Sequence, residues 1–173
     1  MQLGEDTITM SMTLNPVNEA AFQKAVQSLE TLNRAAVFHP TGTGKSCIAW
    51  KVVEAHPQTT FFWLVAGAQR LALRQAELTR YNGGTLPGNV RFCDCEKLAA
   101  ATPEQWVRLG EQKPGCIVLD CYHELSAVCW AQSVQKLLRM CPQAKVLGLG
   151  VPNGAPVCAA AQELFADCIV SHM

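Results

Sequence analysis

Two kinds of apolar segment alternate along the chain. Short unbroken apolar runs are typical of strands buried on both faces, and segments with apolar residues every three or four positions are typical of helices. The unbroken runs predict strands at residues 34–38, 59–66, 90–95, 116–120 and 146–149. The spaced segments predict helices at residues 16–29, 45–55, 68–81, 103–109, 126–140 and 157–165.

This alternation predicts an α/β fold with a central, mostly parallel sheet between two layers of helices. In such sheets, ligands bind at the carboxyl ends of the strands. Residues 1–14 begin polar and then alternate, which leaves open an added edge strand and a loose tail. We therefore expect an N-terminal extension over residues 1–14 and a single domain over residues 15–173.

Composition narrows the class of protein further. The 173 residues are 49% hydrophobic and 16% charged, which is typical of a globular domain, and the formal net charge is zero. A zero net charge excludes a polybasic nucleic-acid binder, although Arg70, Arg74 and Arg80 cluster in one segment. No apolar run is long enough to span a membrane, so we expect no membrane partner.

The nine cysteines do not follow the spacing of a zinc site. Cys93 and Cys95 are separated by one residue, and no Cys-x-x-Cys occurs. The chain also shows no signal peptide. We therefore expect reduced, buried thiols that act as small apolar side chains in a cytoplasmic protein.

The stretch His39–Ser46, which we call the glycine-rich loop, joins a predicted strand to a predicted helix. Glycines let backbone amides curl around a phosphate, and the start of a helix adds partial positive charge. Lys45 would reach the β- and γ-phosphates, and the Ser46 hydroxyl would hold Mg²⁺. The predicted nucleotide-binding residues are Pro40, Thr41, Gly42, Thr43, Gly44, Lys45 and Ser46. An ordinary glycine turn before a core helix is the alternative interpretation.

Asp120 is the second candidate for chemistry, because it ends a wholly apolar run downstream of the glycine-rich loop. A carboxylate in that place commonly helps to hold Mg²⁺ in nucleotide-binding proteins. We therefore predict a metal-holding role for Asp120 together with Ser46. The alternative is an aspartate that caps the turn after its strand.

With these two sites, the chain resembles the first RecA-like domain of superfamily 2 helicases of the DEAD/DEAH type. Within them it is most similar to the branch related to type III restriction enzymes and the UvrB amino-terminal domain. The glycine-rich loop resembles motif I, and Val118–His123 resembles motif II, whose usual form is Asp-Glu-x-His. Leu147–Pro152 lies where the Ser-Ala-Thr of motif III is expected. The resemblance implies a P-loop NTPase fold, ATP and Mg²⁺ as cofactors, and catalytic roles for Lys45, Asp120 and His123.

Several motif residues depart from the family pattern. Cys121 stands where the family has the glutamate that activates water, and a thiol with an ordinary pKa of about 8.5 is mostly protonated at neutral pH. Gly150-Val151-Pro152 lacks the two hydroxyls of motif III. Ala66-Gly67-Ala68 lacks polar groups that would hold a nucleic-acid backbone. We therefore expect impaired hydrolysis and, at most, weak salt-sensitive binding of DNA or RNA through Arg70 and Arg74.

The resemblance also implies a partner domain. Family members bind ATP between two RecA-like domains, and the second one supplies an arginine finger, a group worth about 10³–10⁵ in rate in related enzymes. A chain of this length holds one such domain. We therefore expect either a second RecA-like domain, in a longer parent protein or in trans, or a shortened relative.

The sequence leaves two other functions to consider. The first is a non-catalytic interaction module with a vestigial nucleotide site. The second is a P-loop kinase, which is disfavoured because no lid-like basic segment follows the core.

Overall fold

A six-stranded sheet forms the centre of the computed structural model, which describes residues 11–120, 122, 125–152 and 159–171. Its strand order is β3-β2-β4-β5-β1-β6, and every neighbouring pair is parallel. This arrangement confirms the predicted α/β class with a central parallel sheet. The strands are β1 (Arg34–Phe38), β2 (Phe61–Val65), β3 (Val90–Asp94), β4 (Cys116–Asp120), β5 (Lys145–Gly150) and β6 (Ile169–Ser171).

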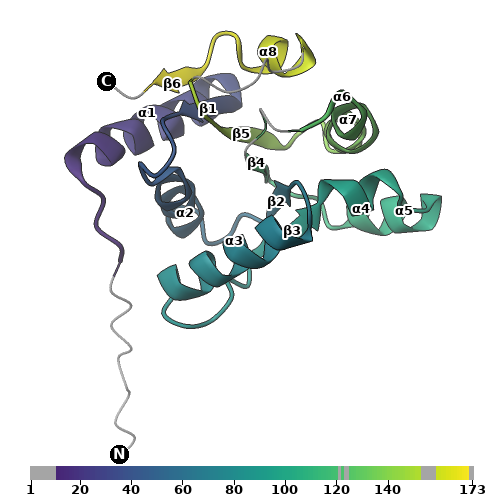
Figure 1. The fold of residues 1–173 in the computed structure, drawn as a ribbon, viewed down its shortest axis with the longest axis horizontal. Helices are drawn as coiled ribbons and strands as arrows, with labels where there is room; N and C mark the ends of the chain where they lie inside the picture. The colour runs from purple at the N-terminus through teal and green to yellow at the C-terminus, as the bar shows by residue number, and fades with distance from the viewer. Residues whose placement is uncertain (1–10, 121, 123–124, 153–158, 172–173) are drawn as a thin grey trace, which may run out of the picture.

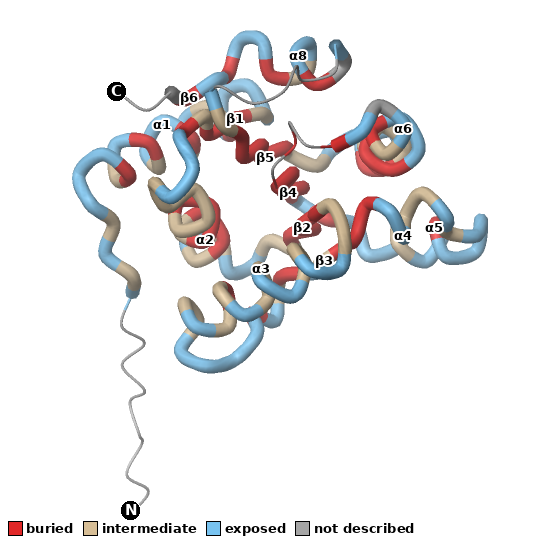
Figure 2. The backbone as a smooth tube through the Cα atoms, in the orientation of Figure 1, coloured by how far each residue is buried: buried red, intermediate tan, exposed pale blue. Residues whose placement is uncertain are grey.

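Helices cover both faces of the sheet (Figure 1). One face packs against α1 (Pro16–Leu32), α2 (Lys45–Ala55) and α3 (Ala68–Tyr81). The other face packs against α4 (Cys95–Ala99), α5 (Pro103–Glu111), α7 (Gln135–Met140) and α8 (Ala159–Phe165), and the short α6 (Ala127–Cys129) leads into α7. Figure 2 shows that the buried positions follow the strands and the helix surfaces turned toward them. The result is the three-layer architecture that the sequence predicts.

Local capping explains where two of the helices begin. Asn15 accepts a hydrogen bond from the Asn18 amide at 2.9 Å, so α1 begins at Pro16 as predicted. Thr102 and Gln105 form a reciprocal capping box at the start of α5. Thr102 is therefore the N-cap of α5.

Three features differ from the predicted elements. The sequence pattern did not predict β6, which has only three residues, or α4, which starts directly after β3. The predicted helix 126–140 contains a π-helical turn at Trp130–Val134. Inside this turn, the buried Ser133 hydroxyl donates to the Cys95 carbonyl at 2.6 Å. This bond ties the turn to α4 and satisfies a hydroxyl that would otherwise be buried without a partner.

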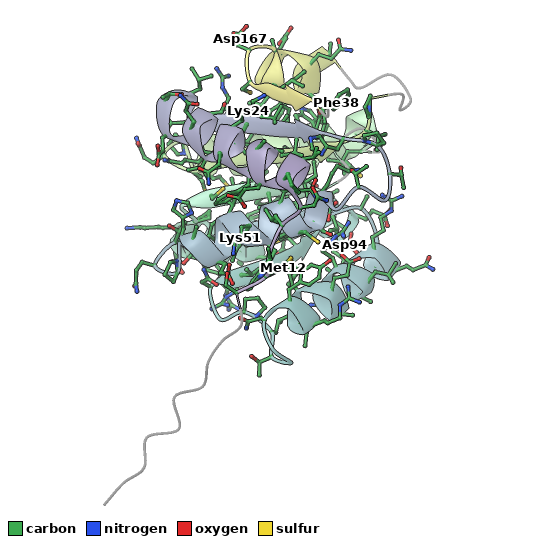
Figure 3. The ribbon with its side chains drawn as sticks, turned by 90° about the vertical axis from the view of Figure 1, so that its left-hand side faces the viewer. Met12, Lys24, Phe38, Lys51, Asp94 and Asp167 are labelled. Atoms are coloured by element: carbon green, nitrogen blue, oxygen red, sulfur yellow. The ribbon has the colours of Figure 1, made fainter. Side chains whose placement is uncertain are left out.

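The described part of the N-terminal extension, residues 11–14, contains no strand. Met12 packs against the core cluster under α1 and α2, and the Ser11 hydroxyl hydrogen-bonds Glu54 and Lys51 of α2. Figure 3 shows Met12 close to Lys51. The rest of the predicted extension, residues 1–10, lies outside the described residues.

The seven cysteines among the described residues are free thiols. Burial raises the pKa of Cys95 and of Cys116 to about 12, and that of Cys93 to about 11. These thiols are neutral at physiological pH and act as apolar core side chains. Within the described part of the chain, no helix combines the length and apolar character needed to cross a bilayer.

Two glycines in β5 make room for aromatic rings. A Cβ at Gly148 would lie 2.7 Å from Phe165 Cζ and 3.0 Å from Tyr122 Cδ1, and a Cβ at Gly150 would lie 2.9 Å from Tyr122 Cε1. The Tyr122 and Phe165 rings are buried and stack on each other with centroids 4.9 Å apart. Glycine at positions 148 and 150 is therefore required by this packing.

We predict that Gly148→Ala lowers the free energy of unfolding by about 1–3 kcal/mol, the usual cost of overpacking a core. Gly88→Ala is the matched control, because nothing lies within 4 Å of the added methyl group. Its effect should stay within about 0.5 kcal/mol. Urea unfolding of the three proteins measures both values, and equal stabilities would contradict the packing argument.

Candidate functional site

The glycine-rich loop turns the chain from β1 into α2. Gly42 and Gly44 have φ angles of +79° and +87°, in the left-handed region that other residues rarely adopt. The amides of Cys47 and Ile48 donate to the Gly44 carbonyl at 3.0 and 3.1 Å, so α2 begins directly at Lys45. The loop therefore ends at the positive end of a helix.

The Lys45 ammonium stays at the loop. It donates to the carbonyls of His39 and Pro40, at 2.9 Å in each case. The Thr43 hydroxyl donates to the same Pro40 carbonyl at 2.7 Å. These bonds hold a positive charge beside the turn where the sequence predicts phosphate.

The side chain of Asn18 on α1 supports the glycine-rich loop. Its side chain is buried, and Nδ2 donates to the Thr43 carbonyl at 2.9 Å. A Cβ on Gly44 would lie 2.9 Å from the same Nδ2 atom, so both the φ angle and the close approach of Asn18 require glycine at this position. Sequence reasoning missed this residue. The sequence does contain a signal for it, because Asn18 falls on the same face of α1 as the buried Ala21 and Ala25.

Asp120 ends β4 on the same edge of the sheet. It pairs with Leu149 of β5, which also pairs with Val37 of β1, so the three residues form one row across the sheet. Two strand spacings place Asp120 about 10 Å from Val37, two residues before the loop. Figure 3 shows Phe38 and Asp94, the last residues of β1 and β3, on the same side of the molecule. The candidate residues therefore gather at the carboxyl ends of the strands.

The Asp120 carboxylate is buried, and both of its oxygens accept hydrogen bonds. Oδ1 accepts from Arg74 Nη2 at 3.1 Å, and Oδ2 accepts from Trp63 Nε1 at 2.9 Å and from Arg74 Nε. Only 4% of the Asp120 side chain and 22% of the Arg74 side chain are exposed. The two side chains therefore form a bidentate ion pair, which is among the stronger polar contacts in proteins.

Arg74 therefore points inward, whereas the sequence predicts that it binds DNA or RNA together with Arg70. Its Nη1 atom also bonds Glu77, one turn further along α3. Burial alone would lower the pKa of Arg74, but the attraction of Asp120 and its hydrogen bonds, with those of Glu77, raise that pKa above its usual range. Arg74 stays charged, and its charge lies against Asp120 and Glu77.

The end of α3 contacts the start of α2. The Cys47 thiol donates to the Tyr81 hydroxyl at 3.3 Å, which places Tyr81 beside Ser46 at the start of α2. Burial raises the pKa of Tyr81, and the bond from Cys47 adds to the shift, so the phenol is neutral at physiological pH. Helix α3 thus contacts Asp120 through Arg74 and the start of α2 through Tyr81.

This donor set does not fit a divalent cation. Mg²⁺ requires oxygen ligands with open lone pairs, and here the carboxylate accepts three hydrogen bonds and touches a guanidinium. Among the described residues, no group of three or more His, Cys, Asp or Glu could hold a metal ion. The metal role of Asp120 and Ser46 stays a prediction, and their contacts in this structure oppose it.

Two predicted residues, Cys121 and His123, lie outside the described residues. Tyr122 between them is buried against β5. Besides Asn18, sequence reasoning missed Trp63 and Tyr81, because a tryptophan in a strand and a tyrosine ending a helix look like core residues. Only the fold brings them to Asp120 and Ser46.

Comparisons with known proteins support the fold. No model of a known protein family and no curated protein matches the sequence. The helicase domain of Hef from Pyrococcus furiosus is similar in structure, with a TM-score of 0.65 and 13% sequence identity, over 89% of this chain and 37% of that one. The DUF1998 helicase MrfA, solved bound to DNA, has a TM-score of 0.65 and 15% identity, over 92% of this chain and 27% of that one.

The chain therefore has the fold of a helicase domain and spans well under half the length of either helicase chain. At such low identity, the similarity concerns the fold alone. It agrees with the helicase-like architecture implied by the sequence.

We predict that Asn18→Ala lowers the free energy of unfolding by about 1 kcal/mol, because the Thr43 carbonyl loses a partly buried hydrogen bond. The control is Gln23→Ala on the same helix, which removes only an exposed bond to Glu19. The control should change stability by less than about 0.5 kcal/mol. Urea unfolding that shows no difference between the two variants would contradict the supporting role of Asn18.

Proposed function

We propose that this chain is the ATP-binding domain of a helicase-like protein of the DEAD/DEAH type. The observation that carries the proposal is the glycine-rich loop, with its two left-handed glycines and with Lys45 held beside the turn at the start of α2. Backbone amides, the end of a helix and a lysine are the groups that bind a polyphosphate. Pro40, Thr41, Gly42, Thr43, Gly44, Lys45 and Ser46 are the proposed contacts.

Similarity to helicase domains supports the type of domain, and one of these neighbours was solved bound to DNA. For this chain we propose only weak contact with DNA or RNA. Arg74 is paired inside the protein, so Arg70 is the remaining candidate of the two arginines predicted for that contact. A second RecA-like domain, in a longer parent protein or in trans, is the proposed partner for any activity.

Hydrolysis by this chain is proposed to be impaired. Cys121 takes the place of the glutamate that activates water in the resembling family, and a neutral thiol is a poor general base. The second function, a non-catalytic interaction module with a vestigial site, differs from the first in one measurable property. A vestigial site shows no saturable nucleotide binding.

We predict that ATP raises the thermal midpoint of the chain. A ligand that binds only the folded state at a hundred times its Kd stabilises it by about 2.7 kcal/mol, or about 5–10 °C for a domain of this size. Lys45→Ala should lose most of this shift. Differential scanning fluorimetry with increasing ATP, in Mg²⁺ buffer and in EDTA, measures it.

An equal shift in wild type and Lys45→Ala would contradict the assignment of Lys45. The absence of any shift in either buffer would favour the interaction module.

We also predict no phosphate release above background from the wild-type chain, with or without single-stranded nucleic acid. Cys121→Glu alone should raise turnover slightly at most, because an arginine finger is still needed from a second domain. Steady-state phosphate release at saturating ATP, with Lys45→Ala as the blank, is the measurement. Clear Lys45-dependent turnover by the unmodified chain would contradict impaired hydrolysis and make His123 the first candidate base.

A further inference from the structure

Both residues predicted to hold a metal lie beside α3. Asp120 is paired with Arg74, and Cys47, the residue after Ser46, donates to Tyr81. We propose that Arg74 takes the place of a divalent cation in this site, so that the chain binds a nucleoside triphosphate without Mg²⁺. This inference rests on the nucleotide binding proposed above and specifies the ionic form of its ligand.

The charge of Arg74 removes the main obstacle to a metal-free triphosphate. An unpaired carboxylate at Asp120 would repel the phosphates, and in metal-dependent sites the cation between them cancels this repulsion. Here the guanidinium contacts both carboxylate oxygens. The carboxylate is therefore neutralised before any ligand arrives.

The geometry of Arg74 is fixed by its neighbours. Nε and Nη2 bond Asp120, and Nη1 bonds Glu77, which lies one turn further along the same helix. A guanidinium carries five N–H groups, and these bonds within the described residues use three of them. The other two can donate to a phosphate oxygen, for which the planar guanidinium is well suited.

Helix α3 borders both parts of the site, and Arg74 lies at its Asp120 end. Arg74 and Tyr81 are seven residues apart, so they share one face of α3 at a spacing of about 10 Å. Because Tyr81 contacts Cys47 at the start of α2 and Arg74 contacts Asp120, one face of α3 borders both parts of the site.

A magnesium-bound triphosphate gains nothing from this arrangement. Its cation would approach a carboxylate that is already paired with a guanidinium, so the positive charges would repel each other. The protein therefore has no preference for the metal complex over the free triphosphate.

The test is equilibrium titration of the chain with a fluorescent N-methylanthraniloyl ATP, in EDTA and in excess Mg²⁺ at matched ionic strength. The wild-type Kd should agree within about twofold between the two buffers, and Lys45→Ala should lose binding in both. Arg74→Gln should weaken binding in EDTA by about tenfold or more, because Asp120 becomes an unpaired negative charge. Mg²⁺ should recover most of that loss.

Three further variants serve as controls for this titration. Arg108→Gln, an exposed arginine on α5, is the matched control and should bind like wild type in both buffers. Arg74→Lys keeps the charge and should retain much of the binding in EDTA. Asp120→Asn should tighten binding in EDTA, because it removes a negative charge and leaves Arg74. Circular dichroism shows whether each variant folds. If Arg74→Gln does not fold, Asp120→Asn still tests the inference.

The outcomes separate failure of the inference from failure of the proposed function. Wild-type binding that is at least about tenfold tighter in Mg²⁺ than in EDTA, or Asp120→Asn that loses binding in Mg²⁺ alone, overturns the inference. Lys45-dependent binding in Mg²⁺ would then still support the proposed function. Absence of Lys45-dependent binding in both buffers overturns the proposed function and the inference together.

Discussion

Burial of the sheet on both faces decides where this chain can carry polar chemistry. Every residue of β2 and β4 is buried, and the only ionisable carboxylate in either strand is Asp120, at its very end. A charge in the middle of such a strand would need a partner inside a closely packed core. Polar groups are therefore confined to the strand ends, and parallel pairing collects those ends at one edge.

The same constraint explains why Asp120 is paired. A carboxylate that is 4% exposed has lost most of its water, and breaking a fully buried ion pair costs about 3–5 kcal/mol. The cost is smaller here because the Arg74 side chain keeps 22% of its exposure. Stability and site chemistry are thus coupled through one guanidinium: a change that frees Asp120 for a ligand also takes away the contact that makes its burial tolerable.

The sequence predicted the local features well and the long-range ones poorly. The limits of β1, β4 and α3 agree with prediction, because unbroken or periodic apolar runs end at clear turn residues such as Asn82-Gly83-Gly84. The glycine-rich loop is also local, since its residues are consecutive. The Arg74–Asp120 pair depends on β2 lying beside β4, which no local pattern encodes. Three-residue β6 is too short to show periodicity, and Asn18 resembles any helix-start asparagine.

The strand order has a consequence for synthesis of the chain on the ribosome. Within the described residues, β1 pairs only with β5 and β6, and Arg34 pairs with Val146. At roughly 5–20 residues per second, the partner strand is translated on the order of ten seconds after β1. During that interval the apolar strand that leads into the glycine-rich loop has neither neighbour, although β2 and β3 can already pair. The loop that defines the candidate site is encoded early, but the strands that flank β1 are translated last. The exposed β1 strand of the nascent chain is therefore the segment that a chaperone would need to protect.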